Sequence, residues 1–194
     1  QAKNVFTYFY FFGEPIDIGG WTGNRRSDEK LGVFHFDLAA ASGIVKSIDF
    51  DTNNGYIYVG GSFTIAGEIN ATNVARYNVN TKIWEALSSL YTNDGVEFGG
   101  EGTNGSGVYA VYWSSNFNRL YVAGSFTAVQ SGYIQATNVA YWTPGIGGLG
   151  TWSALTESSG LQGLSNNGSG GEVLTISDDN TTGYVYFGGL FATA

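Results

Sequence analysis

The chain has 194 residues, of which 43% are hydrophobic and 16% aromatic, so it contains enough apolar material for a folded core. It carries 16 acidic against 8 basic residues, and this negative charge argues against nucleic acid as a partner. With no cysteine, it can form no disulfide, no thiolate nucleophile and no cysteine-bound metal centre.

The first element in chain order is VFTYFYFF at residues 5–12, a short segment rich in β-forming aromatic residues. Its length predicts a buried strand, because a membrane-spanning helix needs about 18 or more consecutive apolar residues. No such run occurs in the chain, so no membrane insertion is expected. The chain opens with Gln1 rather than Met, and we expect either a removed export signal or a piece of a longer protein.

Four short strands are predicted next, at residues 45–50, 55–63, 72–79 and 82–87, separated by clusters of Asn, Gly, Thr and Asp. Large apolar side chains occupy both registers of these strands, as in YIYV at residues 56–59. Strands with this pattern are covered on both faces. We therefore expect four-stranded antiparallel sheets that stack against copies of themselves around an axis.

One phrase occurs three times, as YVGGSFTIAG from residue 58, YVAGSFTAVQ from residue 121 and YFGGLFATA from residue 186. Its glycines Gly61, Gly124 and Gly189 are spaced by 63 and then 65 residues, so the repeat is a supersecondary unit. The fold class predicted is all-β, with β-propeller-like repeats of four-stranded antiparallel blades and an incomplete ring, since propellers close with about four to eight blades. The predicted divisions are a partial, degenerate blade at 1–44, blades at 45–107 and 108–172, and the first two strands of a further blade at 173–194.

The recurring residues of the repeat are predicted to have structural roles. Glycines allow a close backbone approach or a bulge where blades crowd together, and aromatic residues pack between blades. The predicted structural positions are Gly60, Gly61, Phe63, Tyr77, Trp84, Gly124, Phe126, Trp152, Gly188 and Gly189.

The diglycine, followed by an aromatic residue and then a Trp (Tyr77 and Trp84), resembles the kelch blade pattern. The fuller phrase V-GGSFT-AG-ATNVARY-W-AL resembles glycine-rich propeller repeats of secreted and cell-surface proteins, including fungal polarity-marker proteins. In the second copy the insert TPGIGGLG, residues 143–150, departs from kelch spacing. The kelch resemblance also suggests a copper site of the galactose-oxidase kind, which needs a cysteine that this chain lacks.

The segment DFDTNNG at residues 49–55 is similar to an acidic calcium loop, but its Gly stands seventh and no Glu follows at the twelfth place. The equivalent segment of the next copy, YWSSNFN at 112–118, has no acidic residue, whereas SDDNTTG at 177–183 is acidic again. These segments favour hairpin turns over metal sites. No metal and no cofactor are expected.

Catalysis by paired carboxylates would require acidic side chains to converge from different loops. None of the acidic residues, nor the single histidine, stands in a recognisable catalytic motif, so no enzymatic activity is expected. The residues considered as candidates for catalysis are Glu97, Glu101, Glu157, Glu172 and His35.

Two further features concern the surface. Trp21, in GGWTGN, lies outside the regular pattern and is the candidate for an exposed ligand contact. Four N-x-S/T acceptor sequences predict glycosylation, and their asparagines are Asn70, Asn104, Asn167 and Asn180.

These observations favour a non-catalytic extracellular structural scaffold, a repeat module of a cell-surface, sheath, filament or virion assembly. Its expected partners are copies of itself or further blades of a longer chain, and glycans. One alternative is a carbohydrate- or protein-binding propeller whose site lies in the long inter-blade loops at 88–107 and 156–171. A glycoside-active enzyme is the other alternative.

Overall fold

The computed structural model describes residues 9–12, 31–34, 43–87, 107–130, 134–156, 163–165, 171–179 and 181–192. These residues form strands, with one short 3-10 turn, and the strands pair in antiparallel sheets. The largest sheets have four strands each, so the predicted all-β class is confirmed.

The first four-stranded sheet, here called the first blade, contains β3 (Ile44–Asp51), β4 (Tyr56–Ser62), β7 (Val74–Asn78) and β8 (Ile83–Ala86). The strands are hydrogen-bonded in chain order and are antiparallel throughout. They coincide with the four strands predicted from hydrophobic patterning and turn residues.

The second blade repeats this plan with β9 (Gly107–Ser114), β10 (Arg119–Ser125), β13 (Val139–Pro144) and β14 (Gly150–Ala154). A 3-10 turn, η1 (Ile146–Gly148), occupies the insert between its last two strands. In each blade the second and third strands are joined through a small hairpin, which consists of β5 (Ile65–Ala66) and β6 (Ile69–Asn70) in the first, and β11 (Ala128–Val129) and β12 (Ile134–Gln135) in the second.

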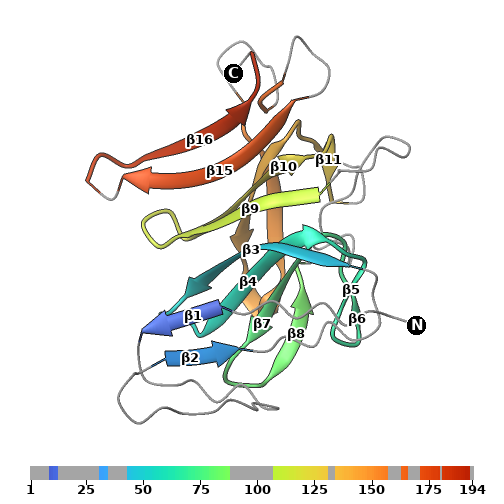
Figure 1. Cartoon of the computed structure of the whole chain (residues 1–194), viewed down its shortest axis with the longest axis vertical. Coiled ribbons are helices and arrows are strands. Elements are labelled where there is room, and N and C mark those ends of the chain that lie inside the picture. Colours follow the sequence, from blue (N-terminus) through green and yellow to red (C-terminus); the bar gives the residue numbers. More distant parts are fainter. Residues whose placement is uncertain are drawn as a thin grey trace.

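Two-stranded antiparallel sheets stand on either side of these blades. The third copy of the repeat supplies β15 (Glu172–Asp179) and β16 (Tyr184–Leu190), and the N-terminal region supplies β1 (Phe9–Phe12) and β2 (Leu31–Phe34). In Figure 1 the sheets follow one another from β15–β16 at the top to β1–β2 at the bottom.

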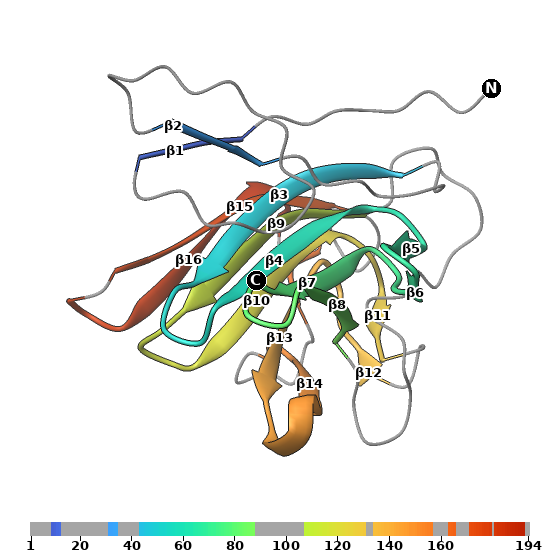
Figure 2. The ribbon, with the colours of Figure 1, turned by 90° about the horizontal axis from the view of Figure 1, so that it is seen from below.

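The sheets are arranged like the blades of a propeller. Their first strands, β3, β9 and β15, lie at one edge and contact one another in sequence, as Figure 2 shows in the view from below. The third and fourth strands, by contrast, lie away from this shared edge (Figure 2). The described part of the chain is therefore a β-propeller-like array of blades that does not close into a ring.

The repeated glycines stand at a β-bulge in each copy. One extra residue on the first strand interrupts the register in all three sheets, beside Gly60–Gly61, Ala123–Gly124 and Gly188–Gly189. A Cβ atom on Gly61, Gly124 or Gly189 would lie about 2 Å from a backbone carbonyl oxygen of the first strand. Any larger residue at these positions would push the two strands apart, and the glycines recur for this reason.

Candidate functional site

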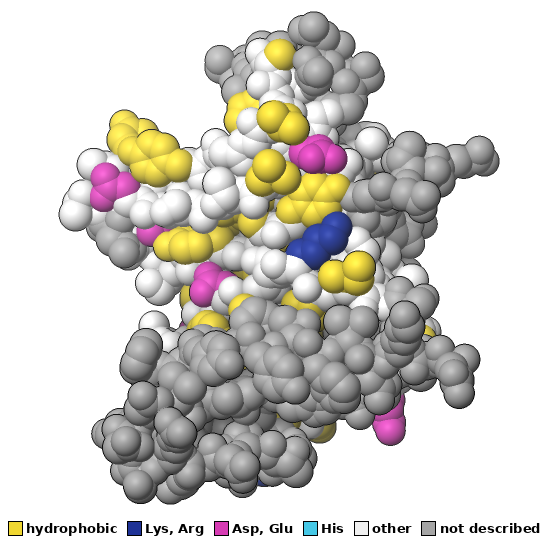
Figure 3. Space-filling view, viewed as in Figure 1, with side chains coloured by type: hydrophobic (Ala, Val, Ile, Leu, Met, Phe, Trp, Pro, Cys, Tyr) yellow, Lys and Arg dark blue, Asp and Glu magenta, His cyan; other side chains and the backbone are white. Residues whose placement is uncertain are grey.

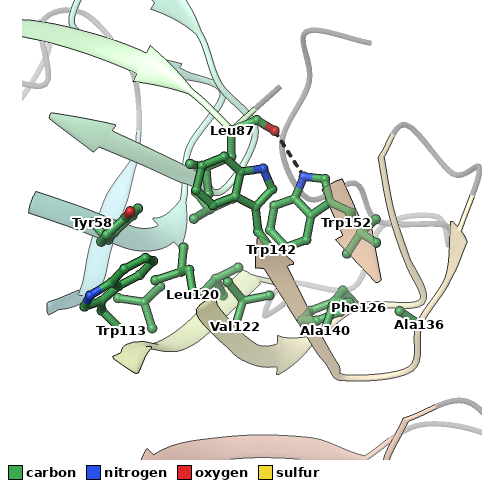
Figure 4. Close-up of a cluster of buried hydrophobic side chains, with 14 residues drawn as sticks. Tyr58, Leu87, Trp113, Leu120, Val122, Phe126, Ala136, Ala140, Trp142 and Trp152 are labelled. Carbon is green, nitrogen blue, oxygen red and sulfur yellow. Dashed lines mark hydrogen bonds between the residues drawn. The ribbon is translucent and has the colours of Figure 1, made fainter. Parts of the chain in front are cut away.

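The boundary between the first and second blades is the best-defined interface of the molecule. Tyr58 of β4 stacks on Trp113 of β9, with ring centroids 5.2 Å apart and the planes 15° from parallel. Further out, the Trp152 indole donates a hydrogen bond of 3.1 Å to the carbonyl oxygen of Leu87. Figure 4 shows these groups in one cluster of buried side chains drawn from both blades. Aromatic rings therefore hold one blade to the next.

Arg76 of β7 is a cation buried at this boundary. Its guanidinium pairs with Glu85 on the neighbouring strand, with Nε 2.8 Å from Oε2, and Nη2 donates to the Gly148 carbonyl of the second blade at 3.2 Å. The same group lies 4.3 Å from the ring centroid of Tyr56 and 5.0 Å from that of Trp142. Arg76 thus combines an ion pair, hydrogen bonds and cation–π contacts. Through them it attaches the insert of the second blade to the first blade.

Two asparagines in the repeated sequence ATNVA have a role that sequence patterning missed. Asn73 and Asn138 both adopt left-handed backbone angles, with φ of 65° and 64°. In each case the side-chain oxygen accepts a hydrogen bond from the backbone N–H of the aromatic residue in the SFT phrase, Phe63 at 3.1 Å and Phe126 at 3.2 Å. Each asparagine thereby holds the small hairpin against the end of β4 or β10, the strand that carries the repeated glycine. The signal was present, since Asn recurs at the same place in both copies.

Acidic side chains connect blades across the shared edge. The carboxylate of Asp49 accepts hydrogen bonds from the backbone N–H of Phe50 at 2.8 Å and of Trp113, in the next blade, at 2.6 Å. Asp178 of β15 accepts from the Tyr112 hydroxyl at 2.6 Å and from the Ser114 hydroxyl at 2.7 Å. Burial raises the pKa of Asp49, and burial together with the Asp178 carboxylate raises the pKa of Tyr112 to about 12. Both carboxylates serve as inter-blade acceptors.

The acidic loops that are similar to calcium sites are hairpin turns. Asp51 accepts hydrogen bonds from the backbone N–H groups of Asn53 and Asn54, both at 3.2 Å. Asp179 accepts from the Thr181 backbone N–H at 2.8 Å and from the Thr182 hydroxyl at 2.8 Å. Hydrogen bonds from Thr181, followed by that from Thr182, lower the pKa of Asp179 to about 2. These carboxylates hold the turns, and no group of metal-ligating side chains occurs among the described residues.

Near the bulges, the edge formed by β3, β9 and β15 carries a basic, an aromatic and an acidic side chain close together. The ammonium group of Lys46 lies 4.1 Å from the centroid of the Tyr109 ring in the next blade. Burial lowers the pKa of Lys46, an effect that the Glu172 carboxylate on β15 partly opposes, whereas burial and then the same carboxylate raise the pKa of Tyr109. Figure 3 shows this face, where hydrophobic side chains gather near single basic and acidic groups. This surface couples three consecutive blades by polar contacts.

The structure places the predicted site residues as follows. Asn70 is exposed on β6, in the small hairpin that precedes Thr72 of its acceptor sequence. Tyr77 and Trp84 contact each other edge to face at 5.3 Å within the first blade, whereas Trp152 lies at the blade boundary. The following predicted site and candidate residues lie outside the described residues: Trp21, His35, Glu97, Glu101, Asn104, Glu157, Asn167 and Asn180.

Comparison with known proteins agrees with this architecture. The family model described as the Rax2 C-terminal beta propeller domain matches residues 35–130, which include the first blade and the first two strands of the second. No curated protein and no solved structure gave a significant match. None of the described residues forms a helix that is long and apolar enough to cross a membrane. Over residues 35–130, the chain is thus similar to a β-propeller domain.

Proposed function

We propose that the chain is a non-catalytic structural module of a cell-surface assembly, in which propeller blades form a glycosylated extracellular scaffold. The observation that supports this proposal most directly is that polar and aromatic side chains make the contacts between neighbouring blades. Asp49, Asp178 and Arg76 all bind groups of a neighbouring blade, and Trp113 and Trp152 pack at a blade boundary. Among the described residues, these two carboxylates and this guanidinium group are thus engaged in holding blades together.

The match of residues 35–130 to a beta propeller domain supports the blade architecture in this proposal, and the scaffold role is inferred from the contacts between blades, because a fold alone does not fix a function. The blade divisions at 1–44, 45–107, 108–172 and 173–194 are part of the proposal, together with the resemblance of the blades to kelch-like repeats. The low content of charged residues, 12%, supports an exterior built of hydroxyl, amide and backbone groups.

The location is tested by antibody labelling of native cells. We expect intact, unpermeabilised cells to be labelled, since a surface scaffold is accessible from outside. Labelling that requires permeabilisation would contradict the extracellular role.

Glycosylation is tested by mass spectrometry of the chain isolated from its own secretory pathway. Asn70 is exposed and is followed by Ala71 and Thr72, so we expect a glycan at this residue. The Thr72→Ala variant, which removes the acceptor hydroxyl but keeps Asn70, is the matched control and should lose that glycan. Four unmodified acceptor asparagines would remove the glycan from the proposal.

A further inference from the structure

The hairpin turn between β3 and β4 contains an asparagine joined directly to a glycine, Asn54–Gly55. Gly55 has a φ of 72°, and a Cβ atom on it would lie 2.7 Å from Nδ2 of Asn80, so the turn requires glycine there. The equivalent residues of the second and third copies, Asn118 and Gly183, also have positive φ, but a phenylalanine and a threonine precede them. Among these three turns, only the first therefore has the Asn-Gly sequence.

An Asn-Gly pair is chemically reactive, because glycine has no side chain that hinders attack by its backbone nitrogen on the preceding side-chain amide. The Gly55 nitrogen loses its proton to the solvent and forms a bond to Cγ of Asn54. The side-chain nitrogen of Asn54 takes up a proton and leaves as ammonia, which closes a five-membered succinimide ring. Water then adds to either carbonyl carbon of the ring and breaks its bond to nitrogen. The product is aspartate or isoaspartate at position 54.

In the folded blade a single residue, Asp51, holds both nitrogen atoms that this reaction involves. The backbone N–H of Gly55, the nucleophile, donates to the Asp51 carbonyl oxygen at 2.9 Å. The side-chain nitrogen of Asn54, the leaving group, donates to Oδ2 of Asp51 at 2.7 Å. Asp51 is 2% exposed, although Asn54 itself is exposed. Both groups must break a hydrogen bond to a buried residue before they can react with each other, and this raises the barrier.

We propose that Asn54 is a latent deamidation site, which Asp51 keeps unreactive in the folded blade and which reacts when the turn opens. The product cannot restore the turn, because a carboxylate at position 54 has no N–H for Oδ2 of Asp51 and places a second negative charge beside it. Isoaspartate also lengthens the backbone between Asp51 and Tyr56, which pair across the two strands. A transient opening thus becomes a permanent loss of the turn. This inference depends on the fold of the first blade and not on the proposed function.

Peptide mapping by mass spectrometry tests the site itself. The full chain is incubated at mildly alkaline pH, either folded or unfolded in guanidinium chloride. We expect aspartate and isoaspartate to form at position 54 at least about tenfold faster in the unfolded chain, because the folded turn is open only a small fraction of the time. Asn80 is the internal control, since it is an exposed turn residue followed by threonine, and it should react slowly in both states. Equal rates at Asn54 in the two states, or no reaction in the unfolded chain, would overturn the proposal.

Substitution of Asp51 tests its protective role in the folded chain. Asp51→Ala removes the acceptor of the Asn54 amide, and we expect the rate at Asn54 to rise about tenfold. Asp51→Asn, which keeps the size of the side chain but has one oxygen in place of two, is used if circular dichroism shows that the alanine variant does not fold.

The matched control is Asp179→Ala, which changes the equivalent turn of the third copy. There the Gly183 N–H donates to the Asp179 carbonyl oxygen at 3.0 Å, but no asparagine precedes the glycine. This variant should leave the rate at Asn54 unchanged. An equal rise in Asp179→Ala would assign the effect to general destabilisation, and an unchanged rate in the folded Asp51 variant would show that Asp51 does not protect Asn54. Either result would overturn the proposal.

Discussion

Tyr58 and Trp113 come from different blades and lie nearly parallel, with ring centroids 5.2 Å apart. Both are buried, so this stack joins the two blades through a large apolar contact. We expect Trp113→Ala to lower the free energy of unfolding by about 3–5 kcal/mol, the usual cost of deleting a buried aromatic side chain. Chemical denaturation followed by circular dichroism measures this difference.

The control for this prediction is Ile83→Ala, which shortens an exposed apolar side chain of the first blade. Its effect should stay within about 0.5 kcal/mol. A loss below about 1 kcal/mol for Trp113→Ala would mean that the two blades are not held together by this stack.

Trp142 and Trp152 allow the hydrogen bond to the Leu87 carbonyl to be measured apart from packing. Both are fully buried, but Trp152 Nε1 donates to Leu87, whereas Trp142 Nε1 is buried with no hydrogen-bond partner among the described residues. Substitution by Phe removes the same atoms from each. We expect Trp152→Phe to destabilise the chain by about 1–3 kcal/mol more than Trp142→Phe, because the Leu87 carbonyl is left unpaired. Thermal and urea denaturation of both variants measure the difference, and equal losses would contradict the assigned role of this bond.

Asn73 and Asn138 combine a left-handed backbone with a side-chain hydrogen bond, and substitutions separate the two. Asn73→Gly loses the hydrogen bond but tolerates the positive φ, whereas Asn73→Ala loses the bond and also strains the backbone. We expect the alanine variant to be less stable than the glycine variant by about 1 kcal/mol. Asn54→Ala and Asn54→Gly form the matched control pair. Asn54 has no positive φ, so this order should not appear there.

These asparagines illustrate what could be predicted from the sequence. The strands of the first blade followed from apolar patterning, and the bulge glycines followed from the repeat. The asparagines were visible in the repeat, but a single left-handed residue leaves no periodic pattern that reveals its backbone angle. The role of Arg76 could not have been predicted, because the equivalent position in the second copy is Tyr141 and the carbonyl that Arg76 binds in the next blade, that of Gly148, is 72 residues away. Long-range pairs of this kind require the fold.

The geometry around Arg76 predicts that charge alone is insufficient at this position. Its Nε and Nη2 atoms bind Glu85, and Nη2 also reaches the Gly148 carbonyl. Lysine carries the charge but lacks the planar guanidinium that makes these contacts and lies over the Tyr56 ring. We expect Arg76→Lys to lower the unfolding free energy by about 1–3 kcal/mol. The control is Arg119→Lys. Arg119 also lies over a tyrosine ring, that of Tyr141, but it is only half-buried, so this variant should lose less unfolding free energy. An equal loss in both variants would argue against a special role for Arg76.

Asp179 gives the chain a defined dependence on pH. Hydrogen bonds from Thr181 and Thr182 lower its pKa in the folded state to about 2, from an ordinary value of 3.8. A depressed carboxyl pKa stabilises the folded state at pH values above the unfolded pKa, and this contribution is lost as the pH falls through the folded pKa. We therefore expect the difference in Tm between wild type and Asp179→Ala to be constant above about pH 5 and to shrink between about pH 4 and pH 2. Glu68→Ala, which removes an exposed carboxylate from the turn between β5 and β6, is the control. A difference for Asp179→Ala that grew on acidification would show that its carboxylate is not stabilised by these hydrogen bonds.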